Sequence, residues 1–206
     1  MRYTTRVDER YLELRDATWR PPLDPGAISG LVIDDHNDRP LIVTGISMGP
    51  VEIEVQARPG PPEPAADSSP WEEIVEFSIQ AGEAPVLVVG GQDAASASAR
   101  INPAGPGWYR VRVHAAGRGN APDLVVTDPM ERYLVQSWPQ GYADPKPIAL
   151  TRTSRAAAGA AAARQALEML EVDLAPEIAN DPERAARANA RLRKARETLQ
   201  RLSERN

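Results

Sequence analysis

Alternation of apolar and polar residues is the strongest pattern in the first 150 positions. Every second residue of 51–57 is apolar, so Val51, Ile53, Val55 and Ala57 share one face of a strand. Two more alternating segments predict these buried residues: Val75, Phe77 and Ile79 in 73–79, and Tyr109, Val111 and Val113 in 109–114. Shorter candidate strands are 11–15, 30–34, 41–47, 86–89, 97–101 and 133–138.

Turn-forming residues separate these candidates at 35–38, 58–62, 90–91 and 102–107. No helix-length periodic segment precedes residue 151, which argues against alternating strands and helices around a parallel sheet. The pattern therefore predicts a mainly β protein, an antiparallel β-sandwich. The segment Arg58–Pro70 holds five prolines, and we expect it to be an exposed, semi-rigid loop between strands.

The last 56 residues have the periodicity of helices. Apolar residues recur at intervals of three and four in two runs: Ala156, Ala160, Ala163, Leu167, Leu170 and Leu174, then Ala185, Ala188, Leu192, Ala195, Leu199 and Leu202. Asp181 and Pro182 have the residue types that start a helix, so the second run begins there. The two runs predict a C-terminal α-helical hairpin that needs the body, a second copy or a partner for stability.

Composition changes at the same place. Residues 151–206 carry 11 Lys/Arg against 8 Asp/Glu, whereas residues 1–150 carry 13 against 21, a balance of −8. All ten aromatic residues and 18 of the 20 prolines lie in 1–150. The change predicts an acidic β-sandwich domain over 1–150 and a helical hairpin tail over 151–206. An acidic body repels phosphates, so we do not expect nucleic acid as a partner.

Several classes of site are excluded by residue counts. The chain has no cysteine and two histidines, which excludes disulfides, cysteine-bound zinc, iron–sulfur clusters and multi-histidine metal sites. The first residues lack an apolar run, and no window approaches 18 uninterrupted apolar residues. We expect a soluble, cytoplasmic protein without a cofactor.

Two clusters of acidic residues contain groups that could bind a cation or transfer a proton. Asp34–Asp38 contains oxygen ligands for a hard cation, but it lacks the glycine and final glutamate of a calcium loop, so a polar turn is the favoured interpretation. Glu72, Glu73 and Glu76 follow Trp71, yet adjacent strand residues point to opposite faces, and we expect solvated carboxylates. With no nucleophile elbow or phosphate-binding loop, the sequence predicts a protein that is not an enzyme.

Basic residues form two possible contact surfaces. Arg110, Arg112 and His114 lie on the outward face of the strand 109–114, where they either contact an acidic partner or, as we favour, are solvated. In the last helix, basic residues recur beside the apolar seam at Arg184, Arg187, Arg191, Lys194 and Arg201. This stripe contacts phosphate or an acidic protein, or else it is a solvated flank or a clamp onto the chain's own acidic body.

Three segments resemble known proteins: Trp71–Ile79, Gly105–Arg118 and Glu131–Pro139. They are similar to a pattern of actinobacterial proteins and, more distantly, to the competence protein ComJ, an inhibitor of a DNA-entry nuclease. The shared order is an early aromatic-rich strand, a tryptophan-acidic segment, a glycine-aromatic strand and a late tryptophan, over about residues 3–139. The resemblance implies a sandwich and an inhibitor role, and it assigns no functional residue.

We therefore expect a non-enzymatic protein-binding protein, similar to immunity proteins or nuclease inhibitors, whose acidic surface occludes a basic partner. Charge and expected exposure select the body's contact residues: Glu52, Glu54, Asp67, Glu72 and Glu76. One alternative is a scaffold that assembles through the tail residues Arg184, Arg187, Arg191, Lys194, Leu192, Leu199 and Leu202. Another is a sandwich that binds sugar or a small ligand on Trp19 or Trp138, although core tryptophans are the favoured interpretation.

Overall fold

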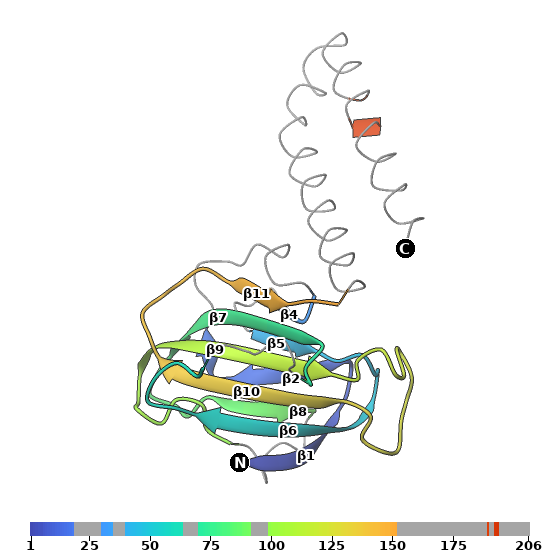
Figure 1. The fold of residues 1–206 in the computed structure, drawn as a ribbon, viewed down its shortest axis with the longest axis horizontal. Helices are drawn as coiled ribbons and strands as arrows, with labels where there is room; N and C mark the ends of the chain where they lie inside the picture. The colour runs from blue at the N-terminus through green and yellow to red at the C-terminus, as the bar shows by residue number, and fades with distance from the viewer. Residues whose placement is uncertain are drawn as a thin grey trace.

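The computed structural model describes residues 1–18, 30–34, 40–63, 70–91, 99–151, 189 and 192–193. These residues form two sheets, and the chain is mainly β, as the alternation predicts (Figure 1). The larger sheet has the order β1 (Arg2–Val7), β6 (Gly49–Ala57), β10 (Arg132–Pro139), β9 (Gly107–Ala116), β7 (Glu73–Ala81) and β11 (Lys146–Ala149), with β3 (Ala17–Thr18) also on β7. The smaller sheet has the order β4 (Val32–Asp34), β5 (Pro40–Val43), β2 (Tyr11–Arg15) and β8 (Leu87–Gly90).

Strands with strict alternation were predicted well. Each of four strands contains its predicted segment and extends one or two residues beyond it. The extension is at one end in β6 and β7 and at both ends in β9 and β10. The predicted strand 41–47 is shorter, because the chain bends after Val43. In the predicted strand 97–101, the described part makes only an isolated bridge between Arg100 and Leu87. β1, β3 and β11 were not predicted.

One strand pair corrects the expectation of an antiparallel sandwich. β10 lies parallel to β6, in register from Arg132 opposite Glu52 to Ser137 opposite Ala57. The other pairs in both sheets are antiparallel. Alternation along one strand identifies its buried face but contains no information about which strand lies beside it or in which direction. The parallel pair joins strands that are far apart in sequence, so no turn between them could predict it.

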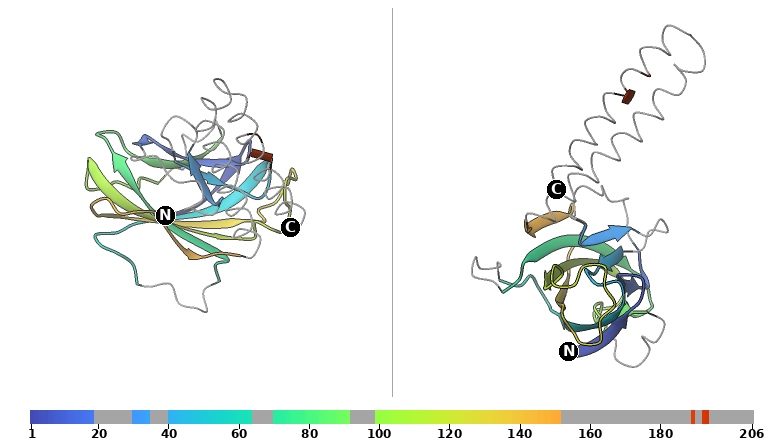
Figure 2. Two further views of the ribbon diagram at one scale, coloured as in Figure 1. Left: turned by 90° about the horizontal axis from the view of Figure 1, so that it is seen from above. Right: turned by 90° about the vertical axis from the view of Figure 1, so that its right-hand side faces the viewer.

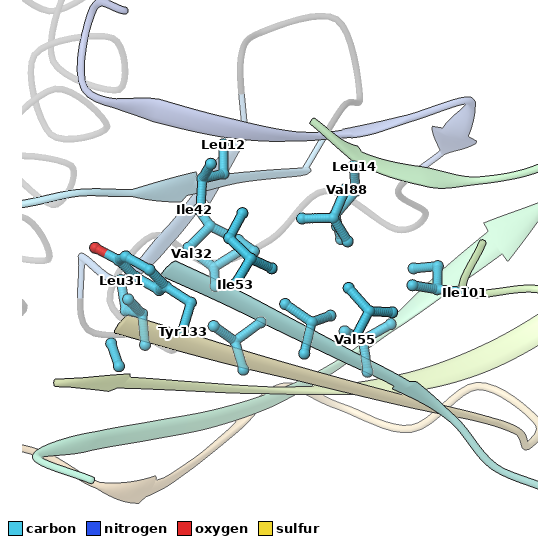
Figure 3. Packing of buried hydrophobic residues seen from close by; sticks show 14 of the residues in the cluster. Leu12, Leu14, Leu31, Val32, Ile42, Ile53, Val55, Val88, Ile101 and Tyr133 are labelled. Carbon is cyan, nitrogen blue, oxygen red and sulfur yellow. The ribbon is translucent and has the colours of Figure 1, made fainter. Parts of the chain in front are cut away.

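The two sheets face each other across one hydrophobic core. Leu12, Leu14 and Val88 from the smaller sheet point toward Ile53 and Val55 of the larger sheet (Figure 3). The residues predicted to be buried in 51–55, 73–79 and 109–114 all lie in this core. Ala57, at the end of its strand, is exposed instead. Figure 2 shows the two layers end-on.

The opposite face of the larger sheet, here called the outer face, is covered in its middle. Arg110, Arg112 and His114 are only 3%, 7% and 5% exposed, so the prediction that they are solvated or contact a partner is wrong. Arg112 Nη1 donates to the backbone oxygen of Glu63 at 3.0 Å, and Arg110 Nη1 donates to that of Ala143 at 2.8 Å. Segments that precede β7 and follow β10 therefore cover these side chains. The alternation of apolar and polar residues did not predict this cover, because the covering residues lie in segments outside the strands.

Candidate functional site

Strand register places the described acidic candidates on the outer face. Glu52 lies beside Arg132 of β10, and Arg132 lies beside Ala116 of β9. The backbone N–H of Glu72 donates to the oxygen of Ala115, so Glu72 continues the same row. Glu54 and Glu76 lie on the same face, farther along β6 and β7. Neighbouring strands are about 4.8 Å apart, so Glu52 and Glu72 are separated by roughly 14 Å along the row.

The row that contains Glu52 and Glu72 is the floor of an open groove of about 330 Å³. The groove lies at one end of the outer face, and its lining includes residues of the β9–β10 connection. Figure 1 shows where this connection leaves the sheet. Its lining residues are Glu52, Pro70, Glu72, Ala116, Gly117, Asn120, Pro129, Met130, Glu131 and Arg132. Two of the five acidic residues selected from the sequence therefore share one concave site.

The carboxylates of the groove differ in their availability. Glu52 is exposed and has no ion pair within the described part of the chain. Glu72 is exposed and accepts one hydrogen bond, from the Gly117 N–H at 3.1 Å. Arg132 is held between them, since its guanidinium lies 5.1 Å from the centre of the Trp71 ring and donates to Pro70 O at 3.1 Å. The groove thus presents two exposed carboxylates around one cation that already has partners.

Glu131 is the buried lining residue of the groove, and both oxygens of its carboxylate accept hydrogen bonds. It accepts hydrogen bonds from the backbone N–H groups of Gly45 at 3.1 Å and Ile46 at 2.6 Å, and from the Tyr133 hydroxyl. Burial, together with the negative charge of Glu131, raises the pKa of Tyr133 well above its usual value. These bonds join β10 to the turn after β5. Glu131 therefore stabilises the fold, and its carboxylate is not available to accept a proton from a ligand.

The β9–β10 connection depends on one glycine. Gly117 has a φ of +85°, and a Cβ there would overlap the backbone oxygen of Met130. Only glycine adopts this conformation without strain and permits this approach of the two ends of the connection. The turn brings Asn120 and Met130 into the lining of the groove, together with Glu52 and Glu72.

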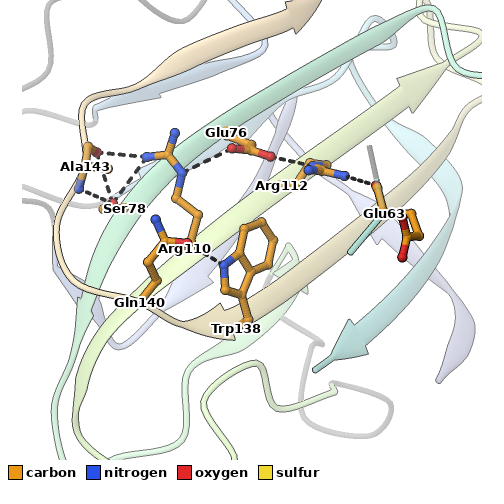
Figure 4. A network of polar contacts seen from close by, with 8 residues as sticks. All are labelled: Glu63, Glu76, Ser78, Arg110, Arg112, Trp138, Gln140 and Ala143. Carbon is orange, nitrogen blue, oxygen red and sulfur yellow. Dashed lines mark hydrogen bonds and ion pairs between the residues drawn. The ribbon is translucent and has the colours of Figure 1, made fainter. Parts of the chain in front are cut away.

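The other described acidic candidates are engaged in ion pairs. Glu76 is nearly buried and binds Arg112 at 2.6 Å and Arg110 at 3.4 Å (Figure 4). Glu54 is half-buried, where it accepts from Arg2 at 2.5 Å and from Gln56 at 2.8 Å. The hydrogen bond from Arg2 lowers the pKa of Glu54. Glu76 is therefore held inside the fold by two buried arginines, whereas the ion pair of Glu54 lies at the surface.

A chain of amide hydrogen bonds connects Glu54 to His114. The Glu54 carboxylate can only accept, so Gln56 donates to it through Nε2, and Gln136 Nε2 donates to Gln56 Oε1 at 2.9 Å. Gln136 Oε1 is then the acceptor for His114 Nε2 at 3.1 Å, which assigns the proton to that nitrogen. Within the described residues Nδ1 has no partner, and the Trp71 ring lies edge-on to the imidazole at 5.5 Å. Burial lowers the pKa of His114 to about 4, so it is neutral at pH 7.

The alternative function, binding of a sugar or small ligand, relied on two tryptophans, and one of them is buried. Trp138 is 2% exposed, its Nε1 donates to Gln140 at 2.7 Å, and the Arg112 guanidinium lies 5.7 Å from its ring centre (Figure 4). No face of this ring is open for a sugar to stack on. Trp19 lies outside the described residues.

Several predicted residues cannot be placed. Asp67, all of 35–38, and Arg184, Arg187, Arg191, Lys194, Leu199 and Leu202 lie outside the described residues. In the tail, 192–193 are helical, and Leu192 is 7% exposed. In the described ranges, histidine and carboxylate side chains nowhere gather in a group of three that could hold a metal ion. The same ranges contain no helix with the length and apolarity needed to cross a bilayer.

Sequence reasoning missed an apolar surface beside the groove. Met48, Leu124, Val125 and Met130 are exposed, and three of them belong to the β9–β10 connection. The available signal was the apolar run at 124–126, which stands between turn-forming residues and outside every predicted strand.

Comparison of the chain with family models, with curated proteins and with solved structures finds no match. The resemblance to ComJ stays a prediction.

Proposed function

We propose that this chain is a non-enzymatic protein-binding protein, similar in action to immunity proteins and nuclease inhibitors, whose groove receives basic side chains of a partner. The observation that supports it most is the presence of two exposed carboxylates, Glu52 and Glu72, in one groove of about 330 Å³. The two carboxylates, roughly 14 Å apart along the row, carry the negative charge that phosphates also carry. They suit a partner surface that binds nucleic acid.

The charge of the body supports the same role. Residues 1–150 carry a balance of −8, and such a field accelerates encounter with a basic protein. Glu54 and Glu76 are part of this field but already have arginine partners, so they contribute at long range only. The proposal retains the predicted organisation, a sandwich body over 1–150 and a helical hairpin over 151–206, with the hairpin assisting association.

The test uses two matched double variants of the full-length chain. Glu52→Gln/Glu72→Gln removes the groove charges, whereas Glu83→Gln/Asp144→Asn removes two exposed charges outside the groove lining. A protein captured by the wild type and by the second variant, but not by the first, is then purified. We expect the groove variant to reduce its association rate about tenfold, and added salt to reduce the wild-type rate. An unchanged rate in the groove variant, or on doubling the salt, would contradict the proposal.

A second candidate function is a scaffold that assembles through the tail. It is based on the apolar seam predicted for 185–202, in which Leu192 is helical and 7% exposed within the single chain. If this is the function, deletion of 152–206 abolishes self-association while circular dichroism of the strands is retained. Retained self-association would exclude the scaffold role.

A further inference from the structure

An apolar patch adjoins the acidic groove. Met48, Leu124, Val125 and Met130, here called the apolar patch, are half of the large hydrophobic side chains that are exposed in the described residues. Leu124 and Val125 are 57% and 67% exposed. Met48 forms a bridge with Val125 and stands four residues before Glu52 in the chain, and Met130 is itself a lining residue of the groove, so the patch adjoins the groove at these two residues.

The patch is held in place by backbone hydrogen bonds. The N–H of Ser47 donates to Leu124 O at 2.9 Å, and the N–H of Val126 donates to Met48 O at 2.9 Å. Asp123 N–H donates to Gly45 O at 2.9 Å, and the Asp123 carboxylate pairs with Arg10. A segment fixed this firmly loses little entropy when it binds. Adjacent exposed apolar side chains on a fixed segment are typical of an interaction surface.

Charge around the patch indicates what covers it. The exposed acids of the groove and of the β9–β10 connection are Glu52, Glu72, Asp123 and Asp128. Of the cations beside them, Arg10 is paired with Asp123, and Arg132 contacts Trp71 and Pro70. We infer that the apolar patch anchors a basic protein segment, in which an aliphatic or aromatic side chain packs on Leu124 and Val125 while arginine or lysine enters the groove. This inference rests on the proposed function. It adds that the partner supplies an apolar side chain next to its basic ones.

The geometry defines a probe. An extended strand rises about 3.3 Å per residue, so arginines four residues apart match the roughly 14 Å between Glu52 and Glu72. The probe is a synthetic peptide with two such arginines followed by two leucines. Matched peptides replace the leucines with serine, or the arginines with glutamate. Affinity is measured by titration calorimetry against the full-length chain.

We expect the arginine–leucine peptide to bind about tenfold more tightly than the arginine–serine peptide. Leu124→Ser/Val125→Ser should remove this advantage and leave the affinity for the arginine–serine peptide unchanged. Ile148→Ser, at an exposed apolar residue of β11 outside the patch, should retain the advantage. We expect no binding of the glutamate–leucine peptide.

Three results would overturn the inference. One is an advantage of leucine that survives in Leu124→Ser/Val125→Ser, and another is failure of the arginine–leucine peptide to bind. The third is a change in molar mass by light scattering in that variant, which would assign the patch to a second copy of the chain. Failure of the proposed function gives a different result, because then Glu52→Gln/Glu72→Gln leaves the affinity for both arginine peptides unchanged.

Discussion

The covered middle of the outer face and the groove at its end use glutamate for different purposes. In the covered middle, the Glu76 carboxylate bonds with Arg112 at 2.6 Å beneath irregular chain. At the groove, Glu52 and Glu72 are exposed on the same sheet face. Alternation along β6 and β7 assigns all these glutamates to one face. The difference arises from what lies over them, so the covered carboxylates stabilise the fold and the open ones are free to bind.

The largest effect should come from the covered ion pairs. Glu76→Ala leaves two buried arginines without their carboxylate, and we expect it to lower the free energy of unfolding by about 3 kcal/mol. Glu72→Ala, on the same face but exposed, should lower it by less than about 0.5 kcal/mol. Urea denaturation measures both, and equal losses would show that the middle of the face is solvated.

His114 should make the stability of the covered region depend on pH. Its pKa is about 4 in the fold and 6.5 when unfolded, so the unfolded state binds more protons between these values. Stability should therefore fall as the pH decreases from 6.5 toward 4, by up to about 1.4 kcal/mol per pH unit. We expect His114→Gln to show a smaller fall over this window in urea denaturation. Parallel curves for the two proteins would contradict the buried, neutral histidine.

The glycine of the groove gives a smaller effect on stability and a local one on the site. Gly117→Ala puts a Cβ against Met130 O at a φ of +85°, and we expect a loss of about 2 kcal/mol in the free energy of unfolding. Gly119→Ala is the control, because no atom lies within 4 Å of the Cβ that it adds. Thermal unfolding compares the two variants. If both are equally stable, the connection is not held by Gly117.

Much of the fold was predictable because one face of each long strand is apolar. The residues Val51, Ile53 and Val55 identify β6 without any neighbour in view. β1 was missed because its core-facing positions are Tyr3, Thr5 and Val7, so only two of them are apolar, and it becomes a strand by pairing with β6. β11 is largely exposed and contains Pro147, so its sequence contains no strand signal either.

The site was predictable only in its residue types. Charge selected Glu52 and Glu72, but it selected Glu54 and Glu76 for the same reason. The parallel register of β6 and β10 and the turn at Gly117 bring the first two into one groove. Both are long-range features, which local periodicity does not contain. The apolar patch was missed for a related reason, since the apolar run 124–126, which supplies Leu124 and Val125, belongs to no strand.

The most direct test compares the two pairs of glutamates in the full-length chain. Glu52→Gln/Glu72→Gln and Glu54→Gln/Glu76→Gln each remove two charges from the outer face, and each variant is measured for unfolding in urea and for affinity toward the arginine–leucine peptide. We predict that the first pair weakens binding about tenfold and changes stability by less than about 0.5 kcal/mol. The second should lower stability by about 3 kcal/mol and leave the affinity of the folded protein within about twofold. Equal loss of affinity in the two variants would contradict a site confined to the groove.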